Sequence, residues 1–384
     1  MKKYLLYAVA ISIIWITLYL IPGCKESKRS SAEGHNLTSP EYPVQILSQE
    51  KDRRVFSSEN PEIVTEINFE ELKNPPFKPN YLHFDKYGAF YTVDFHQCLV
   101  HKFSPSPDWK HFQHIYFGKG RGQGPGEFSQ ILDFKIYLDN IYLVDEGKGA
   151  IEVYSTDGAY KGMIRLNNGL IPRKITFFNS KMIVEAMLPD RPLFYAYDLD
   201  GNFLYSFGEL IEKKNQENKI YHDNYLSDCF SENCFYYLPR FFGFVALYRD
   251  SNLILVKETI DGLIKGKENE AVNKVLAKGI SAQTVKKKHE IVYDFSLYRN
   301  FILIRAYDYQ NKNSFLDLYS SENFDYLLSI KNPPGMWGSF AIWENLFAVL
   351  IETDTGSKVG IYDIAKIIKE ASSKPFYNQH FSRQ

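Results

Sequence analysis

The stretch FGKGRGQGPGEF, Phe117 to Phe128, followed by IYLVDEGKGAIEVYSTDG, Ile141 to Gly158, indicates the fold because its second half recurs along the chain. The shared pattern is an apolar strand, an acidic or polar turn, a second strand and a closing turn. Counterparts begin at Phe90, Met182, Leu253, Phe301 and Leu346, which makes six units. Consecutive β units of this kind bury their faces only against their neighbours, which predicts an all-β fold, a six-bladed β-propeller.

The last unit indicates how the ring closes. It supplies three strands, SFAIW, LFAVLIE and KVGIYDI, and lacks a fourth. The segment EIVTEINFEEL, Glu62 to Leu72, alternates apolar and polar residues before the first full unit, so it can add the missing edge strand. We therefore expect residues 61–384 to be one propeller domain that is closed by an N-terminal strand.

The N-terminal segment predicts the cellular location. Lys2 and Lys3 precede an apolar run from Tyr4 to Ile21, which ends just before Cys24. This pattern is typical of a lipoprotein signal peptide over residues 1–23, with Cys24 as the lipidated residue. The alternative is an uncleaved transmembrane anchor, because about 18 apolar residues can just span a bilayer. Either reading places the body in the cell envelope, facing the periplasm or the cell surface.

The segment after the lipidation site predicts a flexible linker. Residues 24–60 are rich in Ser, Glu, Lys and Arg and contain few apolar residues. Such a composition cannot bury enough apolar surface to fold by itself, so we expect a disordered tether between the lipid and the propeller.

Charge excludes one class of partner. The formal net charge of the chain is -1, with 45 Lys and Arg against 46 Asp and Glu. A protein that binds a phosphate backbone needs a basic surplus, and this chain has none. We therefore expect no nucleic-acid partner, and membrane contact only through the N-terminal lipid.

Three cysteines remain besides the lipidated one, in a compartment that permits disulfides. Cys229 and Cys234 are the candidate pair, because a separation of five residues can close a hairpin. Two buried thiols in an apolar strand pair are the open alternative. Cys98 lies in an apolar strand and is expected to be a buried thiol in the core.

Candidate binding residues follow from the propeller geometry. Innermost strands line the axis, and the connectors that lead into them form one rim of a central funnel. Six segments are candidates for these strands: KPNYLHFD, GEFSQILDF, IPRKITFF, LPRFFGFVAL, HEIVYDFSLY and GMWGSFAIW, which begin at residues 78, 126, 171, 238, 289 and 335. Their entry residues are Lys78, Glu127, Arg173, Arg240, His289 and Trp337. Mixed charges with one tryptophan suit a peptide, a glycan or a protein loop.

Each of these residues also has a local explanation. Charged side chains near strand starts are commonly solvated, and Trp337 can simply cover the apolar end of the last blade. The prediction of a binding rim therefore rests on the convergence of six blades at one opening.

The repeat itself resembles a known family. Residues Phe117 to Ile164 resemble the NHL repeat, in which a glycine-rich connector and an apolar strand precede a strand-turn-strand that carries VaD and ends in a DG turn. Tyr195 to Glu209 fits the closing half of such a repeat. With its lipobox, the chain resembles the six-bladed propeller lipoproteins of Bacteroidetes, a group related to NHL and TolB-like propellers. The resemblance implies the fold and the envelope location, and most of those proteins have no assigned activity.

Sequence features with catalytic potential are weak. The first unit holds five histidines, His83, His96, His101, His111 and His114. The resemblance raises a metal hypothesis, because some NHL-type propellers are lyases that hold zinc with axial histidines. An axial site takes ligands from several blades, yet of these five only His83 is expected on an innermost strand. The glycine-rich segment fits neither GxGxxG nor GxxxxGK[ST], and no GxSxG motif is present. We therefore assign no catalytic residues, no metal and no cofactor.

Two functions from different classes remain. The favoured one is a lipid-anchored cell-envelope propeller that binds a peptide, glycan or protein partner through the funnel rim, because no catalytic constellation is visible. The alternative is an NHL-type envelope lyase or hydrolase with a metal at the propeller axis. A purely structural envelope component is a third possibility.

Overall fold

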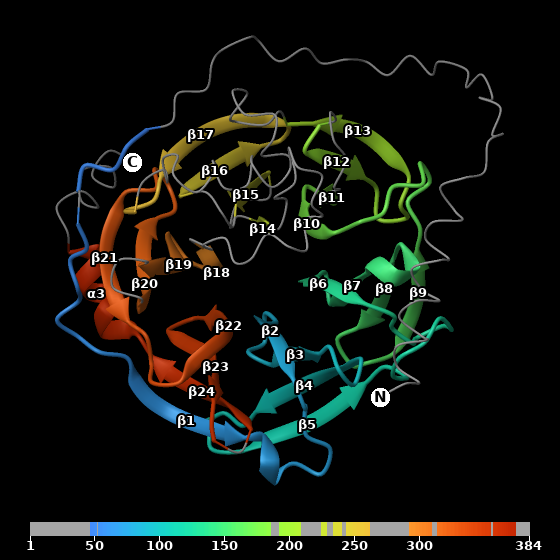
Figure 1. The fold of residues 1–384 in the computed structure, drawn as a ribbon, viewed down its shortest axis with the longest axis horizontal. Helices are drawn as coiled ribbons and strands as arrows, with labels where there is room; N and C mark the ends of the chain where they lie inside the picture. The colour runs from blue at the N-terminus through green and yellow to red at the C-terminus, as the bar shows by residue number, and fades with distance from the viewer. Residues whose placement is uncertain are drawn as a thin grey trace, which may run out of the picture. The chain divides into compact units, whose positions relative to one another are not determined.

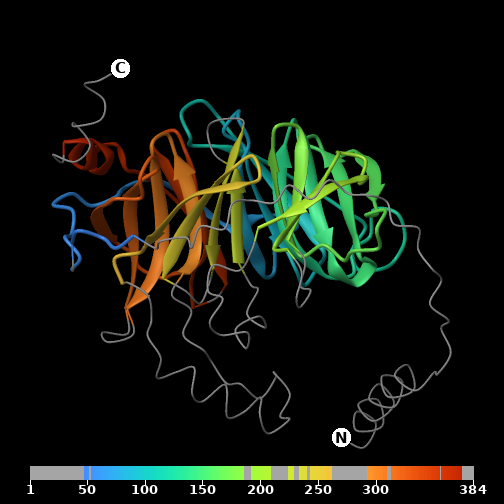
Figure 2. The same cartoon turned by 90° about the horizontal axis from the view of Figure 1, so that it is seen from above.

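The computed structural model describes residues 47–51, 53–185, 192–208, 224–228, 233–239, 243–261, 292–308, 313–354 and 356–373. In these residues the strands form six four-stranded sheets around one axis (Figure 1). Paired strands within each sheet are antiparallel. Seen from the side, the strands run between the two faces of the ring (Figure 2). The chain is a six-bladed β-propeller, as its repeats predict.

Blades are numbered by the chain order of their inner strands, and strands are given from the axis outward. Blade 1 has β2 (Pro79–Phe84), β3 (Phe90–Asp94), β4 (Leu99–Pro105) and β5 (Phe112–Phe117). Blade 2 has β6 (Ile131–Tyr137), β7 (Asn140–Asp145), β8 (Ala150–Ser155) and β9 (Tyr160–Ile164). Blade 3 has β10 (Lys174–Phe178), β11 (Lys181–Glu185), β12 (Phe194–Tyr197) and β13 (Phe203–Phe207).

The other half of the ring repeats this order. Blade 4 has β14 (Asn224–Asp228), β15 (Cys234–Pro239), β16 (Phe244–Arg249) and β17 (Asn252–Glu258). Blade 5 has β18 (Val292–Tyr298), β19 (Phe301–Asp308), β20 (Asn313–Ser320) and β21 (Tyr326–Lys331). Blade 6 has β22 (Met336–Trp343), β23 (Leu346–Glu352), β24 (Ser357–Asp363) and β1 (Glu62–Asn68). Short helical segments are η1 (Phe69–Glu71), η2 (Glu146–Lys148) and α3 (Ala365–Ser372).

The hydrophobic core lies between the blades. Buried apolar side chains of the described residues fall into six clusters, and each cluster joins two neighbouring blades. Tyr91 of blade 1, for example, packs in one cluster with Phe134 of blade 2. Because each sheet buries both faces against its neighbours, no blade has a complete core without the ring.

Strand β1 closes the ring, as predicted. It pairs antiparallel with β24, from Glu62 opposite Asp363 to Asn68 opposite Lys358. Ile67 then packs in the cluster that joins blades 6 and 1. The first strand of the propeller is thus the outer strand of the last blade, which fastens the two ends of the ring to each other.

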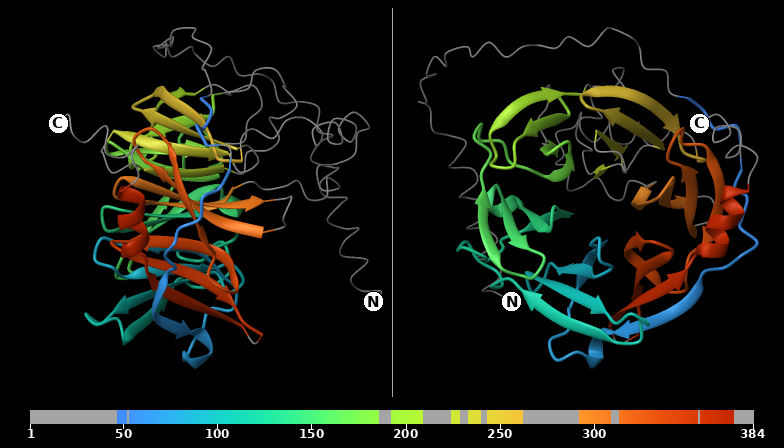
Figure 3. Two further views of the ribbon diagram at one scale, coloured as in Figure 1. Left: turned by 90° about the vertical axis from the view of Figure 1, so that its left-hand side faces the viewer. Right: turned by 180° about the vertical axis from the view of Figure 1, so that it is seen from behind.

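An extended segment, residues 47–58, lies along the outside of blades 4 and 5, and we call it the strap. Leu47 forms a parallel bridge with Lys257 of β17, and Phe56 forms one with Ser329 of β21. Figure 3 shows this segment in blue, outside the ring, before it leads into β1. The strap thereby pairs with outer strands whose free edges would otherwise face solvent.

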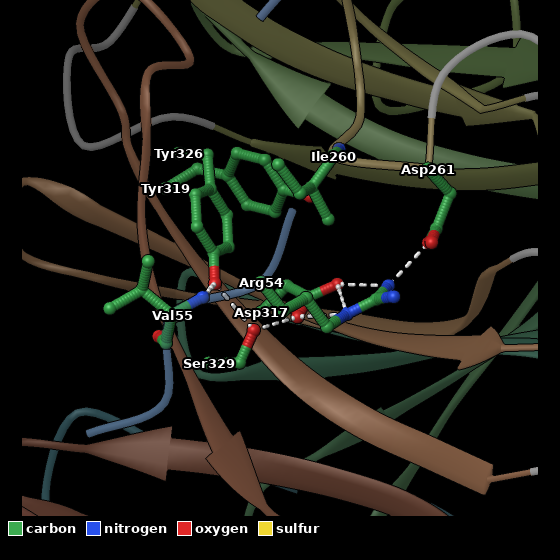
Figure 4. Close-up of polar contacts among 8 residues, drawn as sticks. All are labelled: Arg54, Val55, Ile260, Asp261, Asp317, Tyr319, Tyr326 and Ser329. Atoms are coloured by element: carbon green, nitrogen blue, oxygen red, sulfur yellow. Dashed lines mark hydrogen bonds and ion pairs between the residues drawn. The ribbon is translucent and has the colours of Figure 1, made fainter. Parts of the chain in front are cut away.

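Arg54 anchors the strap to blade 5 (Figure 4). Its Nε donates to Asp317 Oδ1 at 3.0 Å, and its Nη2 donates to Asp317 Oδ2 at 2.9 Å. Nη2 also forms an ion pair with Asp261. The side chain of Asp317 is 0% exposed, and its Oδ1 also accepts a hydrogen bond from Ser329 Oγ at 2.6 Å. A buried carboxylate is therefore neutralised by a residue from outside the blades.

These contacts correct the predicted tether. Residues 24–60 were expected to be flexible, and this is wrong for the described residues of 47–60, because the strap bonds to the ring and Ser57 Oγ donates to Glu370 of α3 at 2.6 Å. The expectation relied on the lack of apolar residues, whereas the strap is held by polar side chains and backbone pairing. Residues 24–46, with Cys24, and the predicted signal peptide lie outside the described residues.

The inner strand of blade 4 is a second correction. LPRFFGFVAL, residues 238–247, was predicted to be the innermost strand, but it runs from the end of β15 into β16, and β14 is the inner strand. Strands β15 and β16 lie in the middle of the sheet and are almost entirely buried, so they are the most apolar of the blade. Hydrophobicity therefore pointed to the wrong strand.

The cysteines divide in part as expected. Cys98 is a free, buried thiol. Cys234 is disulfide-bonded, whereas Cys229 lies outside the described residues, so their pairing stays a prediction. Within the described ranges no helix is both long and apolar enough to cross a membrane.

Candidate functional site

Three of the predicted rim residues, Lys78, Glu127 and Arg173, lie on the connectors before inner strands. Lys78 is exposed immediately before β2. The Glu127 carboxylate turns back onto its own loop and accepts a hydrogen bond from the backbone N–H of Gly124 at 2.7 Å. Arg173 lies immediately before β10, with its Nη1 3.9 Å from Glu146 Oε1.

The remaining rim residues do not complete a ring in the described structure. Trp337 is half-buried in β22, and its indole N–H is enclosed without a hydrogen-bond partner. Arg240, between β15 and β16, and His289 lie outside the described residues. Of the four that the structure describes, none lines the axial cavity, so the role of all six in binding stays a prediction.

The structure instead contains a cavity on the propeller axis, with a volume of about 430 Å³. It is lined by residues from all six inner strands, which surround the centre in Figure 1. Its size falls in the lower part of the range of small-molecule sites in proteins. Its polar side chains include His83, Asp133, Lys135, Lys174, Asp294, Ser296 and Ser339.

Two aspartates in this cavity connect neighbouring blades. Asp133 of β6 accepts a hydrogen bond at 2.9 Å from the backbone N–H of Ile175 in β10. Asp294 of β18 accepts one at 3.1 Å from the backbone N–H of Phe340 in β22. In each case the carboxylate satisfies an inner-strand donor of the next blade, where no sheet partner is available. Ser339 Oγ does the same for the N–H of Leu82 at 3.2 Å, and these three side chains stabilise the ring at its centre.

Burial affects the chemistry of Asp294. Protein surrounds its carboxylate on most sides, and this desolvation raises the pKa of Asp294 above its ordinary value. Hydrogen bonds from Ser339 and from two backbone N–H groups act in the opposite direction, because they stabilise the charged form. The side chain is half-buried, with its exposed part facing the cavity.

Lys174 is held on the cavity wall by several groups. Its Nζ donates to Tyr81 Oη at 3.2 Å and to the carbonyl of Leu132 at 3.0 Å, and lies 4.0 Å from Asp133 Oδ1. Tyr81 Oη also donates to the Leu132 carbonyl. Lys174 thus links three blades, and its ammonium is already engaged.

Lys135 and His83 differ from this network. Lys135 is half-buried in β6 and makes no hydrogen bond or ion pair with any described residue. His83 lies edge-on to Phe134, with ring centroids 5.0 Å apart. Burial, and then the charge of Lys135, lower the pKa of His83 well below its ordinary value, so this imidazole is neutral at physiological pH.

The sequence contained a signal for this cavity. The pair Asp-Phe occurs in two inner strands, as Asp133-Phe134 and Asp294-Phe295, and each Asp follows a register shift in the pairing with the next strand. A charged residue inside an otherwise apolar inner strand has to face either the axis or a buried partner. We predicted binding residues only at the strand entries, so these positions within the strands were missed.

The acidic residue of the repeated VD motif has a structural role. Asp94 Oδ2 accepts from the backbone N–H of Lys78 at 2.9 Å, and its Oδ1 accepts from the N–H of Gln97 at 2.8 Å. Asp145 repeats this in blade 2, with its Oδ1 accepting from the N–H of Gln130 at 2.9 Å. Both carboxylates are fully buried and satisfy the N–H groups of the connector that enters the blade.

The glycine-rich loop is also structural. Lys148 Nζ donates to the carbonyls of Gly124 at 2.9 Å and Glu127 at 2.6 Å, so the loop presents carbonyls to a buried cation. A phosphate cradle needs the opposite arrangement, with N–H groups converging on the ligand. Gly118 has a φ of +105° and lies where a Cβ would be 2.8 Å from the ring of Phe128, which explains the need for glycine.

Two of the five histidines in blade 1 form a pair away from the axis. His101 Nδ1 lies 3.1 Å from His114 Nε2, and the rings are stacked. Burial, followed by the charge of His114, lowers the pKa of His101 to about 4. Across the described residues, no group of three or more His, Cys, Asp or Glu side chains is arranged to hold a metal ion.

Because His101 is buried and neutral, we expect the protein to lose stability in mild acid. The unfolded chain protonates this imidazole near pH 6.5, whereas the folded protein keeps it neutral to about pH 4. The contribution of neutral His101 to the free energy of unfolding is therefore complete above pH 6.5 and decreases as the pH falls. Between pH 7 and pH 5 the free energy of unfolding should fall by about 2 kcal/mol through His101.

Urea denaturation at the two pH values measures this loss. In a His101→Phe variant the difference between pH 7 and pH 5 should shrink by about 2 kcal/mol. His111 is exposed, so His111→Gln should leave the difference unchanged. A His101→Phe variant with the full wild-type difference would contradict the assignment.

Comparisons with known proteins agree with the fold. Residues 114–229, from β5 to just beyond β14, match a family profile described as a 6-bladed beta-propeller. No curated protein sequence matches the chain. The solved structure of a Bacteroides fragilis protein described as exported is similar to this chain, with a TM-score of 0.56 and 10% sequence identity. The match covers 83% of this chain and 98% of that one.

A more distant structural neighbour is an inactive variant of virginiamycin B lyase from Staphylococcus aureus. It shares 10% sequence identity over 76% of this chain and 83% of the lyase, with a TM-score of 0.46. The likeness to the Bacteroides protein shows the fold alone, and the likeness to the lyase is too weak to carry an argument. The relation to NHL repeats stays a prediction.

Proposed function

We propose that this chain is a ligand-binding propeller of the cell envelope, held to the membrane by a lipid on Cys24, with its ligand site in the axial cavity. The proposal rests mainly on one observation, a cavity of about 430 Å³ that polar side chains from different blades line together with aromatic ones. Ligand sites in proteins commonly combine a mostly apolar wall with a few polar groups that fix the orientation of the ligand. Trp343 and Phe84 supply aromatic wall, and Ser296 and His83 supply polar groups.

The bonding of the cavity residues favours binding over catalysis. General acid-base chemistry needs a side chain that is free to exchange a proton with the substrate. Asp133 and Asp294 are hydrogen-bonded to backbone N–H groups of the next blade, and Lys174 is held by Tyr81 and the Leu132 carbonyl. These three groups support the ring, so they are better suited to shape the cavity around a ligand than to exchange protons with a substrate.

Filling the cavity tests the binding site. Ser296 is half-buried and lines the cavity, so Ser296→Trp should place an indole there and abolish ligand binding. Ser206 is exposed on β13, so Ser206→Trp is the matched control and should bind normally. The measurement is saturation-transfer NMR of the full-length protein with a panel of monosaccharides and dipeptides, with circular dichroism as the check of folding.

The outcome separates the cavity from the predicted rim. Binding that disappears in Ser296→Trp and persists in Ser206→Trp supports the axial site. Binding that persists in a folded Ser296→Trp protein would refute it and would favour the strand entries near Lys78 and Trp337. Metabolic labelling of cells with a fatty acid tests the lipid anchor, because the wild-type protein should carry the label and a Cys24→Ala protein should not.

A further inference from the structure

We infer that the axial cavity recognises the carboxylate of a sugar acid, a hexuronate unit, and that Lys135 is the residue that binds the carboxylate. This inference rests on the proposed function and adds the chemical class of the ligand. It is carried by the bonding of the charged groups in the cavity, since among the described residues Lys135 alone of these cations makes neither a hydrogen bond nor an ion pair.

The charged side chains of the cavity differ in the hydrogen bonds and ion pairs that they form. Lys174 has two hydrogen bonds and a carboxylate nearby, and Asp133 and Asp294 are hydrogen-bonded to inner-strand N–H groups. The Lys135 ammonium has three donors and, among the described residues, no acceptor within hydrogen-bond reach. A half-buried cation of this kind is best satisfied by an anion that enters from the cavity.

The surroundings of Lys135 favour a carboxylate on a compact polar ligand. The charge of Asp294 interacts with that of Lys135, and the three hydrogen bonds that Asp294 accepts from Phe295, Ser339 and Phe340 limit its ability to form a direct ion pair. His83, which the charge of Lys135 also reaches, is neutral and can donate one hydrogen bond and accept another. A ligand with one anionic group and adjacent hydroxyls matches this combination.

The rest of the wall favours a sugar ring. Trp343 and Phe84 lie within 6.3 Å of each other by ring centroids and line the cavity, so they offer aromatic surface for the apolar side of a ring. Ser296 and Ser339 provide hydroxyl partners on other blades. A volume of about 430 Å³ suits one ring with its substituents better than an extended chain.

Isothermal titration calorimetry of the full-length protein tests the inference with galacturonate and glucuronate as probes and with galactose and glucose as neutral controls. Wild-type protein should bind a uronate at least about tenfold more tightly than its neutral counterpart, because a charge-assisted hydrogen bond contributes this much. Lys135→Met keeps the length of the side chain and should weaken uronate binding by about 10- to 100-fold. Lys135→Arg keeps the charge and should retain most of the affinity.

Controls separate this inference from the proposed function. Lys161→Met removes the same charge from an exposed position on β9 and should leave uronate binding unchanged. Equal affinity for uronates and neutral sugars, or a Lys135→Met protein that binds uronate as well as wild type, would overturn the inference. A dipeptide that binds through its free carboxylate when no uronate binds would overturn the sugar assignment. In that case, or if neutral sugars bind and Ser296→Trp blocks them, the axial site itself still stands.

Discussion

Replacing Arg54 with Ala should lower the free energy of unfolding by about 3–5 kcal/mol, since this is the typical cost of removing one partner of a buried ion pair. The side chain of Asp317 is 0% exposed, and Arg54 donates to both of its carboxylate oxygens. Without Arg54 the carboxylate keeps, among the residues that the structure describes, only its bond from Ser329 and no counter-ion (Figure 4). The strap would also lose its anchor on blade 5.

Urea denaturation followed by tryptophan fluorescence measures this effect. Arg53 is exposed and precedes Arg54 in the strap, so Arg53→Ala is the matched control and should change stability by less than about 0.5 kcal/mol. The double variant Arg54→Ala, Asp317→Ala should be more stable than Arg54→Ala alone, because it removes the unpaired charge. A loss below about 1 kcal/mol in Arg54→Ala would show that the pair behaves as a surface salt bridge and that the strap is only weakly attached.

Replacing Lys148 with Met should have a comparable effect, about 3–5 kcal/mol, in blade 2. Lys148 Nζ lies 2.6 Å from Glu152 Oε1, and their side chains are 2% and 0% exposed. The same ammonium donates to the carbonyls of Gly124 and Glu127. Methionine fills a similar volume, but of the described partners of Glu152 it leaves only the hydroxyl of Tyr160, at 2.8 Å.

Two readouts distinguish this effect from a general loss of packing. Denaturation gives the change in stability, and hydrogen exchange should show faster exchange in residues 118–127, because the loop loses the cation that holds its carbonyls. Lys161→Met, on the exposed face of β9, is the control and should affect neither readout. A Lys148→Met protein with wild-type stability and unchanged exchange in the loop would show that the buried pair contributes nothing to the fold.

Much of the fold could be predicted from the sequence, because the same short-range pattern of strands and turns recurs in each blade. A polar turn such as Asp157-Gly158 between alternating strands specifies a hairpin locally, and six such units leave few arrangements that bury every sheet face. The closing strand β1 was also readable, since the last unit had three strands and Glu62 to Leu72 alternated in polarity. These features could be predicted because they depend on local sequence and on the number of strands in each unit.

Two elements were missed because their stability comes from distant partners. The strap has the composition of a linker, and only the position of Asp317, more than 250 residues away, shows why Arg54 is held. Strand β14 is short, with Leu226 as a buried apolar residue, whereas the neighbouring middle strands are more apolar. Hydrophobicity identifies middle strands more readily than inner ones, since inner strands face an axis that holds polar groups.

The candidate site was predictable only in general terms. The sequence indicated that function would lie where the six inner strands meet, but it pointed to their entries at Lys78, Arg173 and Trp337. In the structure the cavity lies along the strands, where Lys135 and His83 face the axis beside Asp294. Register shifts in β6 and β18 decide which side chains face inward, and such shifts leave little trace in a single sequence.

A crystal structure of the full-length protein grown with galacturonate would show whether the axial cavity is the ligand site. We expect density for the sugar on the propeller axis, with its carboxylate within hydrogen-bond reach of Lys135 Nζ. Galacturonate bound at the strand entries near Lys78 and Trp337, with no sugar on the axis, would contradict it.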